Sequence, residues 1–205
     1  MSLTSGSLCT PGEYLTWERD REEKHEYRDG TIVGMDPANE RHVLIVGNLV
    51  FALHPQLREQ TCRLFFSQMR VKVSATGLYT YPDLAIVCGE REFEDDRRDT
   101  LLNPQVIIEV LSPSTEAYDR GKKFGQYRRI ESLAEYLLVA QDTPRVERYL
   151  RQPDGDWLLH EAARMEDTMS LPTIRCELRL AEVYDGIDFA EGDGRPEGRL
   201  KNDLP

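Results

Sequence analysis

Two acidic residues lie at apolar segments that are typical of buried strands. Glu109 lies inside the apolar run 106–111, and Asp83 follows Pro82 and opens the run 84–87. A carboxylate without a partner is costly to bury, so Glu109 needs a basic partner or a metal ion. Two adjacent strands could bring both acids to one Mg²⁺ ion, which prefers oxygen ligands and is usually held by one or two carboxylates with water.

Simpler interpretations exist for both acids. Glu109 could form a structural salt bridge or reach solvent at the end of its strand. Asp83 could be an ordinary turn residue, because aspartate is common after proline in turns. The two residues alone leave these alternatives open.

A stripe of polar side chains follows the second strand. Asp119, Lys123 and Tyr127 are spaced four residues apart, in a helix that we predict from Ser112 to about Arg129. They therefore share one helix face. In an ordinary surface helix, the same spacing gives an exposed ion pair between Asp119 and Lys123.

Short helices and strands must position these residues. We expect a capped helix from Pro11 to about Asp20, a hairpin around Asp29-Gly30, and an amphipathic helix from Glu40 to about Glu59. The apolar positions of the latter are 43, 46, 50 and 53, and proline at position 55 disturbs its last turn. Strands are expected at 62–73, 84–87, 105–111, 135–140, 145–150 and 157–160, with a solvated loop at 90–99 and a last element near 178–184.

This order of elements predicts a central mixed β-sheet flanked by helices, in one α/β or α+β domain over residues 1–190. Residues 191–205 are rich in glycine, proline and charge and are predicted to form a flexible tail. The sequence lacks the glycine motifs of dinucleotide-binding and P-loop proteins, which excludes both classes.

Composition narrows the class of protein further. The 205 residues carry a formal charge of −11, which argues against coating nucleic acid by bulk charge. The longest apolar run, 43–53, is too short to cross a membrane, and the N-terminus lacks the pattern of a signal peptide. The four cysteines show no CxxC spacing, so we expect a reduced, cytoplasmic protein in which Cys62 and Cys88 are small buried hydrophobes.

A longer pattern adds a resemblance to these observations. Tyr81-Pro82-Asp83, followed by IIEVLSPST at 107–115, resembles the restriction-endonuclease-like superfamily with its PD-(D/E)xK signature. More closely, the chain resembles the Uma-type family of endonucleases. The shared segments are EYRDG at 26–30, His42, DRGKK at 119–123 with Tyr127, and EYLLV at 135–139. The resemblance covers about residues 11–160 and implies the restriction-endonuclease-like fold.

The resemblance implies roles for single residues. Leu111 stands where ExK would place its lysine, so the lysine would come from the following helix as Lys123, with Lys72 as a competitor. The implied catalytic residues are Asp83, Glu109, Lys123 and Glu26. The metal ion, Mg²⁺ or Mn²⁺, would be held by Asp83, Glu109 and the backbone carbonyl of Val110. The substrate would be contacted by His42, Arg120 and Tyr127. Glu26 could equally belong to a solvated charged face, His42 could pack against the hairpin, and Gln68 could line the cleft.

These roles predict a metal-dependent endonuclease that hydrolyses phosphodiester bonds in nucleic acid. By resemblance the substrate is DNA, and the protein acts as a homodimer. One alternative is a nuclease fold that has lost catalysis and keeps a binding or regulatory role, which Leu111 and the acidic total favour. Another is an interaction domain whose acids form ordinary ion pairs. The retained Asp83, Glu109 and Lys123 favour the nuclease, and the net charge does not speak against it, because residues 119–130 contain five basic residues and one acid.

Overall fold

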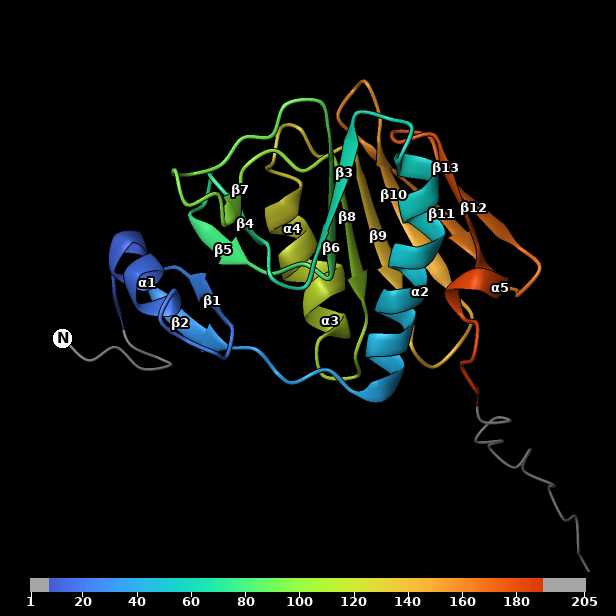
Figure 1. Cartoon of the computed structure of the whole chain (residues 1–205), viewed down its shortest axis with the longest axis horizontal. Coiled ribbons are helices and arrows are strands. Elements are labelled where there is room, and N and C mark those ends of the chain that lie inside the picture. The colour runs from blue at the N-terminus through green and yellow to red at the C-terminus, as the bar shows by residue number, and fades with distance from the viewer. Residues whose placement is uncertain (1–7, 190–205) are drawn as a thin grey trace, which may run out of the picture.

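A six-stranded mixed sheet is the largest element of the computed structural model, which describes residues 8–189 (Figure 1). β8 and β9 pair in parallel, and every other neighbouring pair in this sheet is antiparallel. In spatial order its strands are β11 (Trp157–Ala162), β10 (Val146–Arg151), β9 (Glu135–Val139), β8 (Val106–Val110), β6 (Leu84–Cys88) and β3 (Cys62–Phe66).

A second sheet contains the N-terminal hairpin. Its strands lie in the order β2 (Thr31–Gly34), β1 (His25–Arg28), β5 (Leu78–Thr80), β4 (Arg70–Val73) and β7 (Thr100–Leu101). The predicted turn between β1 and β2 is confirmed, with Asp29 and Gly30 both at positive φ. The capping box at Thr10 and Glu13 is confirmed at the start of α1 (Pro11–Glu18). A third sheet consists of two strands, β12 (Thr168–Leu171) and β13 (Cys176–Arg179), and precedes α5 (Leu180–Val183).

Helices cover both faces of the six-stranded sheet, as predicted (Figure 1). On one face α2 (Glu40–Leu57) packs on the residues of β6 and β8 that point its way, among them Leu84, Ile86 and Ile108. The other face carries a helical run of α3 (Glu116–Tyr118), a π-helical turn η1 (Asp119–Lys123) and α4 (Phe124–Tyr127). The mixed α+β architecture with a central sheet is therefore confirmed. The tail predicted for 191–205 lies outside the described residues.

The buried face of α2 overlaps the predicted apolar positions, since Leu53 is buried and Val46 and Val50 pack against the same core. Ile45, Leu49, Leu53 and Leu57 are buried, whereas Val43 is 58% exposed. Both stripes repeat at helical spacing, so the sequence alone does not separate them. Pro55 does not end the helix, which continues to Leu57: the proline removes one N–H from the ladder, and the next turn still closes with Arg58 N–H donating to the His54 carbonyl.

The strand predicted over 62–73 is two strands in different sheets. Ser67, at φ 62°, breaks it between β3 and β4. β12, with its alternating exposed and buried residues, was not predicted. Cys62 and Cys88 oppose each other on β3 and β6 and form a disulfide, so the expectation of free thiols was wrong for this pair. No helix among residues 8–189 has the length and apolar content of a membrane span.

The acidic loop at 90–99 is tied to the fold rather than fully solvated. Arg19 of α1 donates two hydrogen bonds to Asp99, and the Nη2 atom of Arg70 lies 2.7 Å from Asp99 Oδ2. Burial alone would raise the pKa of Asp99, but the two guanidinium groups outweigh burial and hold that pKa well below its usual range.

Replacing Asp99 tests this anchor. We expect Asp99→Asn to lower the free energy of unfolding by about 1–2 kcal/mol at pH 7, as is typical for hydrogen bonds to charged groups. A carboxyl with a lowered pKa stabilises the fold above its unfolded pKa, and this contribution disappears as the pH falls through the folded pKa. In urea titrations the difference from wild type should shrink below about pH 4. Asp96→Asn, in an exposed part of the same loop, is the control; equal losses for both variants would contradict the assignment.

Candidate active site

A buried lysine surrounded by carboxylates forms the centre of the candidate site. Lys123 is 5% exposed, and its Nζ atom lies 2.9 Å from Glu109 Oε1. The same atom lies 3.4 Å from Glu26 Oε1 and 3.5 Å from Asp119 Oδ1. Three parts of the chain thus meet at one ammonium group: strand β1, strand β8 and the helical run. Sequence reasoning brought Glu26, Glu109 and Lys123 to one site, and the structure places them together.

Side chains along β8 point alternately to the two faces of the sheet, which explains why Glu109 faces the helical run. Ile108 and Val110 point to the α2 side, whereas Ile107 and Leu111 point to the other side. Glu109 therefore shares a face with Leu111. Leu111 is buried in that core, so the position of the ExK lysine is filled by an apolar side chain. Lys123 reaches the same carboxylate from the helical run instead.

Burial and charge set the protonation of the cluster. Burial raises the pKa of Glu109 to about 8, the ammonium of Lys123 opposes this shift, and Asp119 and Asp83 add to it. Burial also raises the pKa of Asp119. The pKa of Lys123 is raised because the surrounding carboxylates outweigh its own burial. The cluster therefore holds more carboxylates than its one lysine can neutralise.

Hydroxyl groups hold two of these carboxylates in place. Tyr127, fully buried, donates a hydrogen bond of 2.8 Å from its hydroxyl to Glu109 Oε1. Thr80 on β5 donates a bond of 2.5 Å to Glu26 Oε1. Tyr127 was predicted to contact the substrate, and in the structure its hydroxyl positions Glu109. Thr80 was missed, because nothing in its local sequence shows that β5 lies beside β1.

Asp83 lies next to this cluster with partners of its own. It precedes the first residue of β6, and the register Leu84↔Ile108 places it across from Glu109. Its Oδ2 atom accepts a 2.7 Å bond from the backbone N–H of Val110, and its Oδ1 atom lies 2.9 Å from His42 Nε2. Gln141 Nε2 lies 3.2 Å from His42 Nδ1. If Gln141 donates there, the ring proton of His42 is on Nε2 and is donated to Asp83.

Other predicted residues lie away from the ammonium of Lys123. Arg120 donates bonds to Glu116 and Glu147 and forms an ion-pair network on the other side of the helical run. Lys72 is held by Glu94 at 2.6 Å, and the side chain of Gln68 is exposed. Sequence reasoning gave no role to Lys24, which donates a 2.6 Å bond to the carbonyl of Ser67. Burial lowers the pKa of Lys24, and the charge of Asp83 opposes this shift.

The donor set fits a hard divalent cation in charge and chemistry. Asp83 and Glu109 offer carboxylate oxygens from opposed strand ends, and Asp83 is 21% exposed on its side chain. Mg²⁺ needs only one or two protein carboxylates, with water and substrate filling its other positions. Within residues 8–189, no three Asp, Glu, His or Cys side chains form a ready-made metal cage, so a site here would consist of these two acids.

Comparison with known proteins decides the family. The model of the family described as "Uma2: Putative restriction endonuclease" matches residues 11–182. The chain belongs to the Uma2 family. Two curated relatives from Synechocystis, both described as uncharacterized proteins, are 36% and 35% identical. Their matches span 88% and 78% of this chain and 93% and 91% of the relatives.

A solved structure confirms the fold. A crystal structure described as a putative nuclease belonging to DUF820, from Anabaena variabilis, superposes with a TM-score of 0.71 at 18% identity. The match covers 86% of this chain and 97% of the other. The predicted fold is thus shared with this structure, and membership of the Uma2 family supports a nuclease function.

Removing the central ammonium tests the cluster. We expect Lys123→Met to lower the free energy of unfolding by about 3–5 kcal/mol near pH 8, because the substitution leaves buried carboxylates without a cation. Carboxyl groups with raised pKa values stabilise the fold below the unfolded pKa and lose this contribution as the pH rises through the folded pKa. The loss should therefore be smaller at pH 5.5, and adding Glu109→Gln should recover part of it.

Lys122→Met is the matched control for this substitution, because Lys122 is the exposed neighbour of Lys123. Chemical denaturation followed by circular dichroism provides the measurement. A Lys123→Met variant as stable as Lys122→Met at pH 8 would show that the carboxylates do not depend on this ammonium.

Proposed function

We propose that this protein is a metal-dependent endonuclease that hydrolyses phosphodiester bonds in DNA. The observation that supports the proposal best is the meeting of Lys123 with Glu109 at the strand ends, with Asp83 opposed on β6. A lysine and two acids at adjacent strand ends are the parts that the PD-(D/E)xK resemblance implies. Family membership supports the nuclease part of the proposal.

Asp83, Glu109 and the backbone carbonyl of Val110 would hold Mg²⁺ or Mn²⁺. Such an ion polarises the scissile phosphate and lowers the pKa of a bound water when it is present. The protein side chains around this ion would then have distinct roles. His42 fixes Asp83 by its 2.9 Å contact, and Tyr127 fixes Glu109. Both are positioning residues rather than substrate contacts.

Lys123 would stabilise the charge that develops on the phosphoryl oxygens. Its ammonium has three N–H donors, and a donor aimed at developing charge in a site that excludes water contributes strongly to rate. Glu26 lies 3.4 Å from the ammonium and favours its charged form.

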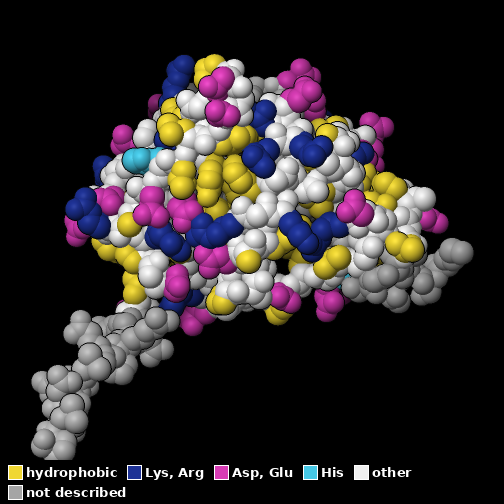
Figure 2. Space-filling model, turned by 180° about the vertical axis from the view of Figure 1, so that it is seen from behind, with side chains coloured by type: hydrophobic (Ala, Val, Ile, Leu, Met, Phe, Trp, Pro, Cys, Tyr) yellow, Lys and Arg dark blue, Asp and Glu magenta, His cyan; other side chains and the backbone are white. Residues whose placement is uncertain are grey.

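Basic side chains lie across the middle of the face turned away from the viewer in Figure 1, among acidic and apolar side chains (Figure 2). They supply local attraction for a polyanion despite the net charge of −11.

A second function is a binding or regulatory protein without catalysis. Three carboxylates surround Lys123, and Leu111 fills the ExK lysine position with an apolar side chain. An ammonium that stayed in those ion pairs would not reach a phosphate. This function predicts nucleic-acid binding without cleavage.

Plasmid nicking with Mg²⁺ or Mn²⁺ tests the endonuclease proposal. Wild type should convert supercoiled DNA to nicked or linear forms, and chelation of the metal should stop the reaction. Asp83→Asn and Glu109→Gln should each lower the rate at least about a hundredfold, the scale of losing one charge-stabilising group. Glu131→Gln, an exposed acid near the opposite end of β9, should cleave as fast as wild type.

Equal cleavage by all four proteins would indicate a contaminating nuclease and refute the enzyme. Binding of labelled duplex DNA without cleavage would support the second function. A parallel assay with RNA of the same sequence tests the choice of DNA, and faster cleavage of RNA would overturn it.

The proposal includes a homodimer, because cutting both strands of a duplex requires two sites. Sedimentation velocity at micromolar concentration should give about twice the monomer mass of 23.6 kDa. A single monomeric species that still linearises plasmid in one binding event would contradict this part of the proposal.

A further inference from the structure

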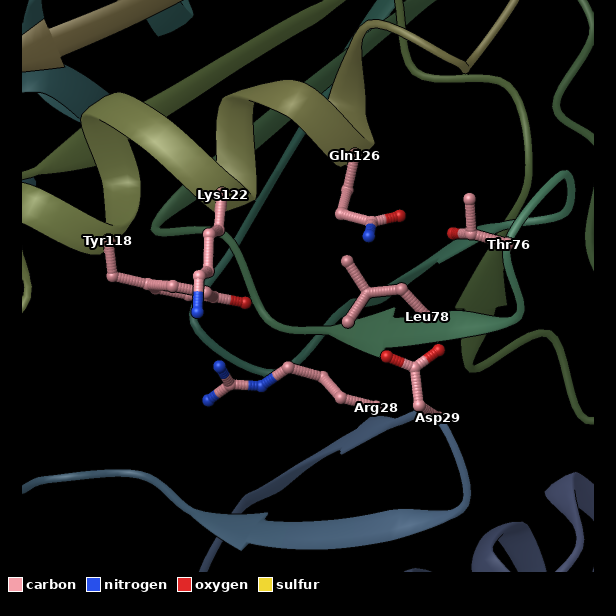
Figure 3. A pocket seen from close by; sticks show the side chains of 7 residues that line it. All are labelled: Arg28, Asp29, Thr76, Leu78, Tyr118, Lys122 and Gln126. Carbon is pink, nitrogen blue, oxygen red and sulfur yellow. The ribbon is translucent and has the colours of Figure 1, made fainter.

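Two surfaces outside the carboxylate cluster differ in what they could bind. One is a pocket of about 190 Å³ between the helical run and the second sheet, lined by charged and polar side chains such as Arg28, Asp29 and Lys122 (Figure 3). Pockets for drug-sized ligands have volumes of about 300–1,000 Å³ and mostly apolar walls. This pocket is too small and too polar to dock a macromolecule, whereas the outer face of α2 is open and apolar.

The outer face of α2 carries apolar side chains along the middle of the helix. Val43 is 58% exposed, Leu44 is 43% exposed and Phe51 is 82% exposed. Gly47 lies between them, and a Cβ atom at this glycine would meet no other element within 4 Å. We call these four residues the outer stripe. Among the described residues, no helix or strand lies in front of α2 in Figure 1, so the outer stripe faces away from the fold.

An exposed aromatic side chain extends this surface toward the edge of the sheet. Phe66 of the edge strand β3, against which α2 packs, is 53% exposed. It is paired with Leu84, and paired residues on neighbouring strands point to the same face of a sheet. Leu84 belongs to the core beneath α2, so Phe66 points to the same side. Contiguous exposed apolar surface marks sites of interaction with other proteins.

Charged side chains of opposite sign flank the outer stripe. Glu40 lies in the first turn of α2, His54 lies in the last turn, and Arg58 is the C-cap. Positions 40, 44, 47, 51, 54 and 58 are separated by alternating steps of four and three residues, the spacing of a coiled-coil seam. Within residues 8–189, the side chains of Glu40 and Arg58 have no ion-pair or hydrogen-bond partner. Both charges are therefore free to pair with another molecule.

The outer stripe is complementary to itself when two copies of α2 lie antiparallel with Gly47 on the twofold axis. Val43 precedes Gly47 by four residues and Phe51 follows it by four. Phe51 of each copy would therefore pack on Val43 of the other copy. Gly47 has no side chain to keep the two backbones apart at the axis. A twofold interface requires such a patch, because both subunits use the same surface.

The charges agree with the antiparallel direction and disagree with a parallel one. Glu40 precedes Gly47 by seven residues and His54 follows it by seven, with Arg58 one turn further. In an antiparallel pair, the acid of each copy meets the basic end of the other copy. In a parallel pair, Glu40 would meet Glu40 and Arg58 would meet Arg58. An apolar centre with a polar rim is also the usual anatomy of protein interfaces.

We propose that the outer stripe of α2 is the interface of a homodimer, in which the two α2 helices pack antiparallel about Gly47. The apolar middle is buried between the copies, and the charged ends set the direction of pairing. The inner side of the same helix carries His42, which orients Asp83. As the arrangement that brings two sites to one duplex, this inference rests on the proposed function; as an interface, it is tested without cleavage.

Sedimentation velocity at micromolar concentration, without metal or DNA, tests the interface. Phe51→Asp should be monomeric where wild type is dimeric, a weakening of at least about thirtyfold, the scale of a residue at the centre of an interface. Because Phe51 is exposed, the variant should keep the circular dichroism spectrum of wild type. Leu158→Asp is the matched control, since Leu158 on β11 is apolar and 55% exposed, and this variant should stay dimeric.

Charge reversal tests the direction of pairing. Glu40→Lys and Arg58→Glu should each weaken the dimer severalfold, because like charges then meet at both ends of the interface. The double variant should recover the affinity of wild type. A double variant that dimerises no better than the single ones would refute the antiparallel arrangement.

A cross-link tests the position of the axis. Two copies of Gly47→Cys bring their new thiols together at the axis, so mild oxidation should yield a disulfide-linked dimer. Gly12→Cys is the control, because Gly12 is an exposed glycine of α1 with equal space around it. It should stay unlinked, as should wild type with its free Cys9 and Cys176.

Three further results would overturn the inference: a wild type that stays monomeric, a Phe51→Asp variant that dimerises as tightly as wild type, or a Gly47→Cys variant that cross-links no faster than Gly12→Cys. The nuclease proposal fails separately. A dimer that depends on Phe51 but never nicks plasmid would refute the enzyme and keep the interface. A protein that nicks plasmid, and whose dimer survives Phe51→Asp, would refute the interface alone.

Discussion

The ammonium group of Lys123 is the interaction on which the site depends. A buried charge is tolerated only beside groups of opposite charge, and here the buried ammonium and the buried carboxylates stabilise each other. Glu26 comes from the N-terminal hairpin, whereas Glu109 and Asp119 come from β8 and the helical run that follows it, and all three lie 2.9 to 3.5 Å from one nitrogen atom. The N-terminal hairpin, the central strand and the helical run are therefore held in register by one cation.

This arrangement would also make the proposed metal ion and the lysine compatible in one small volume. The cluster contains more acids than its lysine neutralises, and the pKa of Glu109 rises to about 8 in response. The divalent cation of the proposed function would relieve the same excess without displacing the lysine if it lay on the Asp83 side. His42 and the backbone N–H of Val110 already orient Asp83 there.

The sequence predicted those parts of the structure that local pattern determines. Glu109 was recognisable as an acid inside an apolar run, and Asp29-Gly30 as a tight turn. The position of Lys123 came from resemblance, because i,i+4 spacing alone equally describes a surface pair. The full buried face of α2 was not predictable, since two apolar stripes compete at helical spacing, and the break at Ser67 was missed because a positive φ at a serine leaves no local sequence signal. Thr80 and Lys24 gain their roles only through contacts between distant segments.

The parallel pairing of β8 and β9 has a consequence for tolerance to length changes. Parallel neighbours require a crossover, and this crossover, 111–134, is the segment that carries Asp119, Lys123 and Tyr127. One residue inserted ahead of Tyr118 would turn the helix by about 100°. Lys122 would then occupy the place of Lys123, but Tyr118 would replace Asp119, and Gln126 would replace Tyr127. The stretch from Glu109 to Lys123 therefore has a fixed residue count, because any insertion within it rotates the helical run away from the cluster.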